Sequence, residues 1–363
     1  MQTQDAVLAD KPVFRSGIKQ NLFKNAAGNK RLGWIDYARG LAILLVVYRH
    51  SVIGIQRSGS TVPSIIFYLQ EFVYNFRMPV FFLLSGFFLS FSLKKYSVPK
   101  LISKKAKTLL YPYILWSIIL ITLQIIMSRY TNTVRTIRDY QFILTQPRQV
   151  DHMWYLLALF NTSALFLLLY NWLGKLPLVH VAVAIMLHFS CFLFQDYSFF
   201  SDLCYYYIYL VLGVVLAGVL IRMESSSKRK LTHALIVVVP FFILGQFLWL
   251  YNQPETITLT VPFLMITLIA CAFFYLICKI FYSSGWGLWL TEIGRNSLQI
   301  YILHILIISS FRIAITQVVA EPNIYLLLCG SMILGIAGPI LIHRLLQYWG
   351  FWFLFSLEKP SNK

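Results

Sequence analysis

The chain has 363 residues, of which 58% are hydrophobic and only 12% are charged. Soluble globular proteins carry about 25% charged residues, so the composition excludes the soluble classes and indicates an integral membrane protein. The formal net charge is +18. The basic residues lie mainly at the ends of apolar stretches rather than in a folded basic domain, which argues against nucleic acid as a partner.

The N-terminal 33 residues are basic and lack the apolar core of a cleavable signal peptide. Beyond them, successive apolar stretches are each long enough to cross a hydrocarbon core of about 30 Å as a helix. The alternation expected of membrane β-strands is absent from the sequence. The sequence therefore predicts an all-α fold, a polytopic membrane helical bundle with about ten transmembrane helices. The predicted spans are residues 34–55, 73–93, 108–128, 153–173, 178–195, 203–222, 232–251, 260–282, 298–318 and 324–347.

The predicted organisation is a basic cytoplasmic tail (1–33), a ten-helix transmembrane domain (34–347) and a cytoplasmic C-terminal tail (348–363). With the N-terminus inside, most basic residues fall on the cytoplasmic side, as the positive-inside rule requires. The basic residues that remain outside are Arg57, Arg129, Arg135, Arg138 and Arg148. The last four lie in one loop (129–152), which either faces an anionic acceptor or is a solvated loop with some interfacial helix.

Ionisable residues are concentrated in the first predicted span. Arg39 and His50 are eleven residues apart, which is about 16 Å of helical rise and brings both side chains within about 20° of one direction. Imidazole is suited to the role of general base because its ordinary pKa lies near 6.5. Two plainer interpretations stay open: an interfacial His50 with a satisfied hydrogen bond, and an Arg39 that snorkels to headgroups or pairs with Asp36.

Two further clusters follow on the chain. Arg77 and Ser85 lie in the second predicted span, where packing alone would also explain Ser85. A collar of basic residues precedes Pro112 and would attract phosphates on the cytoplasmic side, although topology alone also favours lysines there. This collar consists of Lys104, Lys105 and Lys107.

Polar residues also begin the ninth predicted span, in the segment 293–304 (IGRNSLQIYILH). His304 lies about two turns inside it, which indicates a lined cavity or a bond between helices. The five cysteines include no C-x-x-C pair, so neither a metal site nor a disulfide framework is expected. H-E-x-x-H, P-loop and G-x-S-x-G motifs are absent, so metalloprotease, ATPase and serine-hydrolase functions have no support.

Taken together, these segments resemble the acyltransferase-3 family of polytopic membrane acyltransferases, over roughly residues 31–347. The most specific element is Arg39, within the sequence IDYARG (residues 35–40), followed by ten residues and then His50. The supporting matches are residues 78–87 (MPVFFLLSGF), the basic run ahead of Pro112, residues 152–156 (HMWYL) and residues 293–304.

The resemblance implies an O-acyltransferase, most commonly an O-acetyltransferase, in the bacterial cytoplasmic (inner) membrane. Its donor would be acyl-CoA, commonly acetyl-CoA, used as a co-substrate with no permanently bound cofactor. Its acceptor would be a hydroxyl of a surface polysaccharide or of a polyprenyl-linked oligosaccharide. His50 would be the general base, Arg39 would serve the donor side, and Lys104, Lys105 and Lys107 would contact the CoA phosphates. Further donor- or substrate-binding candidates are Arg77, Ser85, Trp154, Asn296, Tyr301 and His304.

The chain departs from the family pattern in three respects. Its basic run contains lysine instead of arginine, no fused esterase-like domain is expected, and Arg49 stands beside His50. Transfer would therefore be direct or completed by a separate partner. A transporter or flippase of a glycan or lipid-linked precursor is the alternative, since buried Arg and His also line transport pathways. A membrane scaffold would leave Arg39 and His50 unexplained. The acceptor sugar, the acyl group and a homo-oligomeric state are left open.

Overall fold

The computed structural model describes residues 32–128, 135–252, 261–319 and 322–358. Within these ranges all regular structure is helical, and ten helical spans are long and apolar enough to cross a membrane. The predicted fold class is confirmed. The predicted N-terminal tail, except for residues 32 and 33, lies outside the described residues, as does Arg129. The observed spans are Gly33–Arg57, Ser64–Ser92, Val98–Ile126, Asp151–Leu173, Pro177–Phe194, Ser198–Arg222, Lys228–Tyr251, Val261–Ser284, Ser297–Val318 and Ile324–Tyr348.

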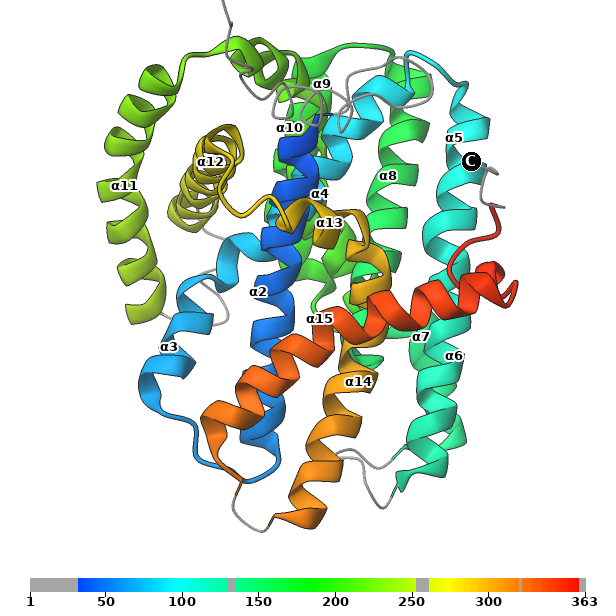
Figure 1. The fold of residues 1–363 in the computed structure, drawn as a ribbon. Helices are drawn as coiled ribbons and strands as arrows, with labels where there is room; N and C mark the ends of the chain where they lie inside the picture. Colours follow the sequence, from blue (N-terminus) through cyan, green and yellow to red (C-terminus); the bar gives the residue numbers. More distant parts are fainter. Residues whose placement is uncertain (1–31, 129–134, 253–260, 320–321, 359–363) are drawn as a thin grey trace, which may run out of the picture.

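Helix α2 (Gly33–Arg57) runs through the middle of the bundle, between α11 (Lys228–Tyr251) at one edge and α6 (Tyr111–Ile126) at the other (Figure 1). It packs against α4, α12, α13, α14 and α15. Such enclosure keeps polar side chains of α2 away from lipid, where an ionisable group would be costly. The helix with the most ionisable residues is therefore held inside the protein.

The second span begins earlier than the sequence predicts. Helix α3 (Ser64–Phe72) leads into α4 (Tyr74–Ser92), whereas the predicted span starts at residue 73. Gln70 and Glu71 interrupt the apolar pattern, but both side chains accept hydrogen bonds from Arg49, at 2.5 Å and 3.0 Å. Polar residues of α3 are thus satisfied by a neighbouring helix rather than by water.

The third span also extends beyond its predicted start. It comprises α5 (Val98–Lys105), a π-helical turn (Ala106–Leu110) and α6. Pro112 lies in the first turn of α6, where its missing N–H costs little. The lysine collar, expected ahead of a helix, therefore lies on the helix itself, and π-helical turns of this kind often occur at functional sites.

Glycines allow α4 and α10 (Ser198–Arg222) to cross in close contact. A Cβ at Gly86 would collide with the carbonyl oxygen of Leu210, and a Cβ at Gly213 would collide with that of Leu83. Each helix thus presents a glycine to the backbone of the other, the type of contact that small residues permit in membrane bundles. This crossing fixes the position of the polar residues on α4.

The segment after α15 folds back onto α5 and α6. The Trp116 indole donates a hydrogen bond to the carbonyl of Leu354 at 2.7 Å, and the Leu357 amide donates to the carbonyl of Lys107 at 3.1 Å. Glu358 then lies 3.7 Å from the Lys104 amine. Residues 352–358 are therefore docked beside the lysine collar.

Candidate active site

Two large cavities enter the bundle, and α2 contributes to both. The Arg39 cavity has a volume of about 420 Å³ and is lined by α2, α4, α5, α8 (Trp154–Leu173), α13 (Leu290–Arg295) and α14 (Ser297–Val318). The His50 cavity has a volume of about 530 Å³ and is lined by α2, α4, α10, α14 and the segment leading into α8. Both volumes fall in the range of ligand-binding pockets. The two predicted catalytic residues thus lie in different cavities.

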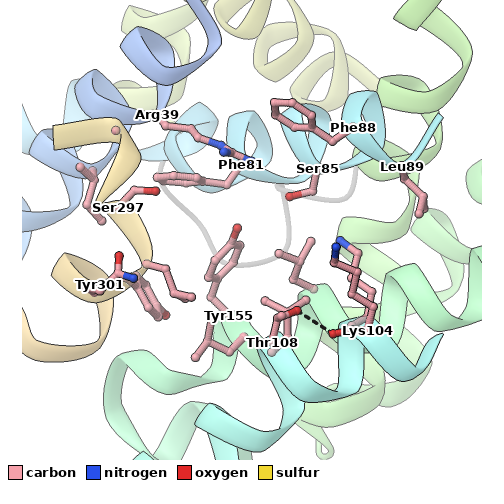
Figure 2. Close-up of a pocket in the computed structure, with 18 of the residues that line it drawn as sticks. Arg39, Phe81, Ser85, Phe88, Leu89, Lys104, Thr108, Tyr155, Ser297 and Tyr301 are labelled. Atoms are coloured by element: carbon pink, nitrogen blue, oxygen red, sulfur yellow. Dashed lines mark hydrogen bonds between the residues drawn. The ribbon is translucent and has the colours of Figure 1, made fainter. Parts of the chain in front are cut away.

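The Arg39 cavity has a cationic lining. Arg39 lies over the Phe88 ring, with its guanidinium carbon 4.5 Å from the ring centroid. Figure 2 shows Arg39 and Ser85 on one side of the cavity, with Tyr155 and Lys104 across from them. Lys105 also lines it, and its described lining includes no Asp or Glu. The cavity is therefore suited to an anionic ligand.

A smaller pocket of about 220 Å³ adjoins the Arg39 cavity and shares Lys104 with it. Lys107 lines this pocket rather than the larger cavity, together with Lys100 and Tyr96. The predicted lysine collar is thus divided between two neighbouring pockets, with Lys104 lining both. Glu358 from the docked C-terminal segment lies at the same pocket.

Three histidines from different helices lie together, and two of them, His50 and His152, line the His50 cavity. The ring centroids of His50 and His304 are 5.1 Å apart, those of His152 and His304 are 4.9 Å apart, and those of His50 and His152 are 6.2 Å apart. The Nδ1 atom of His304 lies 2.9 Å from the carbonyl oxygen of Ile300 and 2.8 Å from that of Tyr301. A neutral His304 ring therefore donates from Nδ1 and keeps a lone pair on Nε2.

Tyr301 lines both cavities. Its hydroxyl donates a hydrogen bond to the carbonyl of His152, and its ring centroid is 5.2 Å from that of Tyr155. Phe82 extends this aromatic layer, with its ring 5.4 Å from Tyr155 and stacked 4.6 Å from Tyr206. The Arg39 cavity and the His50 cavity therefore meet at Tyr301.

The other predicted site residues are distributed as follows. Arg77 and Trp154 line the His50 cavity, whereas Ser85 lines the Arg39 cavity. His304 lines neither cavity, but its ring contacts the ring of His50, which does line the His50 cavity. Asn296 also lies outside both and donates to the backbone and carboxylate of Glu292, at 2.9 Å and 3.3 Å.

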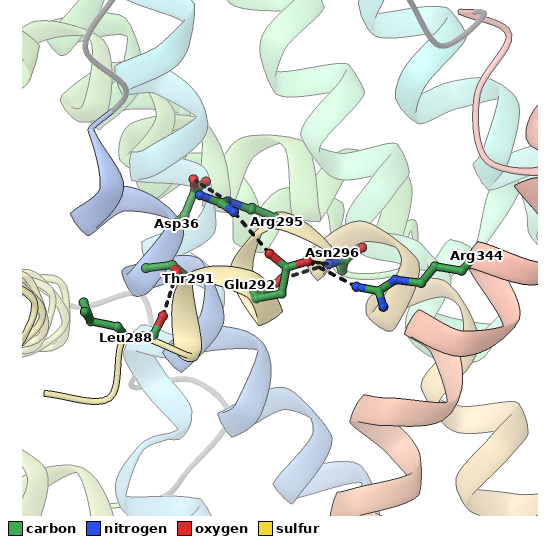
Figure 3. A network of polar contacts seen from close by, with 7 residues as sticks. All are labelled: Asp36, Leu288, Thr291, Glu292, Arg295, Asn296 and Arg344. Atoms are coloured by element: carbon green, nitrogen blue, oxygen red, sulfur yellow. Dashed lines mark hydrogen bonds and ion pairs between the residues drawn. The ribbon is translucent and has the colours of Figure 1, made fainter. Parts of the chain in front are cut away.

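Asn296 belongs to a polar network beside the Arg39 cavity (Figure 3). Arg295 lies 3.8 Å from Asp36 and 3.2 Å from Glu292, and Arg344 lies 3.5 Å from Glu292. A Cβ at Gly294 would collide with the carbonyl oxygen of Asp36, so α13 is pressed directly against α2. The network positions α13, which forms part of the cavity lining.

Two predicted loop arginines are held by carboxylates. Arg135 is buried and lies 3.9 Å from Asp139 and 4.0 Å from Asp151. Arg148 donates to Asp202 from two nitrogens, at 2.8 Å and 2.6 Å, and lies over the Trp154 ring. Of these two arginines, only Arg148 lines the His50 cavity.

The sequence analysis missed several residues of the His50 cavity, including Asn75, Asp202, Tyr206 and Trp249. Asp202 could have been found from the sequence, because an isolated carboxylate at the end of a membrane-spanning segment is costly and therefore indicates a functional role. Asn75 gave none, because a single amide in the first residues of a predicted span resembles an ordinary residue of the membrane interface.

Comparison with known protein families identifies the family of this chain. Residues 32–344 match the family model described as “Acyltransferase domain”, of type 3. No curated protein and no solved structure matches the chain. The match spans all ten helical spans except the end of the last. The chain therefore belongs to the acyltransferase-3 family, and it is a membrane acyltransferase.

Proposed function

We propose that the protein transfers an acyl group, most commonly acetyl, from acyl-CoA to a hydroxyl of a surface polysaccharide or polyprenyl-linked glycan. The observation that carries this proposal is the meeting of a cationic cavity and a histidine-bearing cavity at Tyr301. A donor and an acceptor that enter separately can then react where the two cavities meet.

The donor would occupy the Arg39 cavity. CoA is polyanionic, and Arg39, Lys104 and Lys105 supply the positive charge that its phosphates require. Lys107, at the adjoining pocket, would contact the same phosphates from the other side of Lys104. The acyl thioester would then reach toward Tyr301.

The acceptor would occupy the His50 cavity with its hydroxyl beside His50. In the reaction, His50 takes the hydroxyl proton while the oxygen attacks the thioester carbonyl, which forms the C–O ester bond. The C–S bond then breaks and the CoA thiolate recovers the proton from His50. His304, in contact with His50, holds the imidazole in place for both transfers.

The topology that fits this reaction has both termini in the cytoplasm, as the basic residues favour. The Arg39 cavity would then open toward cytoplasmic acyl-CoA and the His50 cavity toward the outer side of a bacterial cytoplasmic membrane. The activity would reside in the ten-helix domain, with the tails outside it.

A transporter of glycans is the competing function, because two cavities meeting at one layer are also what an alternating-access pathway requires. Proteoliposomes separate the two. With acetyl-CoA inside and candidate glycans outside, the acyltransferase yields acetylated glycan in the external medium. Uptake of unmodified glycan without acetylation would instead support the transporter.

A further inference from the structure

Several buried polar atoms without hydrogen-bond partners belong to residues that line the His50 cavity. Among the described residues, both amide atoms of Asn75, Oδ2 of Asp202, Nε1 of Trp249 and Nε of Arg77 accept or donate no hydrogen bond. Asn75, Asp202 and Arg77 are only 6%, 1% and 5% exposed. All four residues line this one cavity. Buried polar groups are normally paired, so a cluster of this kind indicates a ligand site.

The cluster offers both donors and acceptors in fixed positions. Arg148 binds only Oδ1 of Asp202, so Oδ2 stays available to accept from a ligand hydroxyl. Asn75 follows directly after Tyr74 in the first turn of α4 and is 6% exposed. An amide and a carboxylate so placed are suited to the hydroxyls of a sugar, each of which both donates and accepts.

Aromatic rings form the apolar part of the same cavity. Tyr74 is stacked on Trp249, with the ring centroids 6.0 Å apart, and Trp154 lies 5.4 Å from Tyr206. Flat rings beside a few placed polar groups are the usual composition of a small-molecule site. A pyranose ring, with polar edges and apolar faces, matches this combination.

The charge of the cavity is not balanced at Arg77. Arg49 lies 3.0 Å from Glu71, and Arg148 lies 2.6 Å from Asp202. Among the described residues, Arg77 has no carboxylate oxygen within 4.0 Å; it donates to the carbonyl of Leu45 at 3.4 Å, and its guanidinium carbon lies 5.4 Å from the Tyr74 ring centroid. A buried guanidinium without a carboxylate partner is costly unless a ligand supplies the opposite charge.

We propose that the acceptor bound in the His50 cavity is an anionic sugar. Arg77 binds its carboxylate or phosphate, while Asn75 and Asp202 bind hydroxyls of the same ring. This inference rests on the proposed function and narrows its acceptor class. It also makes Arg77 a specificity-determining residue rather than a group that acts on the reacting atoms.

Calorimetry on the full-length protein in detergent, without acyl-CoA, tests the inference. The probes are methyl glucuronide, glucose 1-phosphate and methyl glucoside, which carry a carboxylate, a phosphate and no charge. We expect at least one charged probe to bind about tenfold or more tightly than the glucoside. The charged probe that binds more tightly identifies the anion that the site takes.

Variants locate the effect. Arg77→Gln should abolish the preference for the charged probe and leave glucoside binding unchanged. Asn75→Ala should weaken all three probes alike, because it removes hydrogen-bonding atoms without changing the charge of the cavity. Arg312→Gln is the matched control, because Arg312 is also buried, at 7% exposed, but lines neither cavity.

Three results would overturn the inference: equal binding of charged and neutral probes, no binding of any probe, or an unchanged preference in Arg77→Gln. Acetyl-CoA binding and acetyl transfer are measured on the same preparations. A protein that transfers acetyl groups without a preference for anionic sugars overturns this inference alone. A protein that prefers anionic sugars but never transfers an acyl group overturns the proposed function.

Discussion

The imidazole of His304 packs edge-on against that of His50, with the ring planes 61° apart. Because Nδ1 of His304 is held by two backbone carbonyls of its own helix, this ring is a rigid support for His50. His304→Ala should therefore lower kcat for acyl transfer by about tenfold, less than loss of the base itself. The KM for acyl-CoA should stay within about twofold, because His304 does not line the donor cavity.

The control for this variant is His180→Ala. His180 is also buried and bonded to a backbone carbonyl, at 3.0 Å, but it lies outside both cavities. Its kcat should match that of the parent protein. A His304→Ala protein with the kcat of the control would remove the supporting role.

Tyr301 is expected to couple the two cavities. Tyr301→Ala should open the aromatic layer, so that water reaches the acyl thioester and CoA thiol is released without an acceptor. Tyr301→Phe keeps the ring and should show little of this hydrolysis, although it leaves the carbonyl of His152 without its donor. A thiol-reactive dye measures both. Equal hydrolysis by the two variants would show that the ring is not the barrier.

The crossing of α4 and α10 should tolerate no side chain at its centre. Gly213→Ala forces a Cβ onto the carbonyl of Leu83 and should lower the thermal stability of the detergent-solubilised protein strongly, by about 2 kcal/mol or more. Gly218→Ala on the same helix meets nothing within 4 Å. It should be neutral or stabilising by up to about 1 kcal/mol. Similar thermal shifts for both variants would refute the close contact.

Charge at the small lysine pocket should control donor binding. Lys104→Gln should raise the KM for acyl-CoA about threefold, and Glu358→Gln should lower it, because Glu358 competes for the same lysine. Both effects should shrink as salt rises, since Lys104 is 50% exposed. Steady-state kinetics at two ionic strengths gives the answer, and a KM that moves in the same direction for both variants would contradict it.

Much of the fold could be predicted from sequence because apolar spans of membrane length leave few alternatives. The errors lie where polar residues interrupt those spans. Gln70 and Glu71 are typical of a loop between spans. In the structure they lie in helix α3, where Arg49 on another helix donates hydrogen bonds to both side chains. The lysines of α5 likewise resemble residues that flank a membrane span. They lie within the helix because their long side chains can reach polar surroundings from a helical position.

The candidate site could be predicted only where a single helix carries the information. The spacing of Arg39 and His50 along α2 is such a case. The environment of Asn75 depends on contacts between helices that no local pattern encodes. For Asn296 the local sequence pattern is misleading. Its polar neighbours suggest a ligand contact, but in the structure its side-chain amide donates hydrogen bonds to Glu292.

The most direct test of the central claim is acetyl transfer by His50→Ala beside His180→Ala, measured with equal amounts of folded protein and saturating acetyl-CoA. The account predicts at least about a hundredfold loss of transfer in His50→Ala, with acetyl-CoA still bound in the Arg39 cavity and His180→Ala fully active. Transfer by His50→Ala at the rate of His180→Ala would contradict the assignment of His50 as the general base.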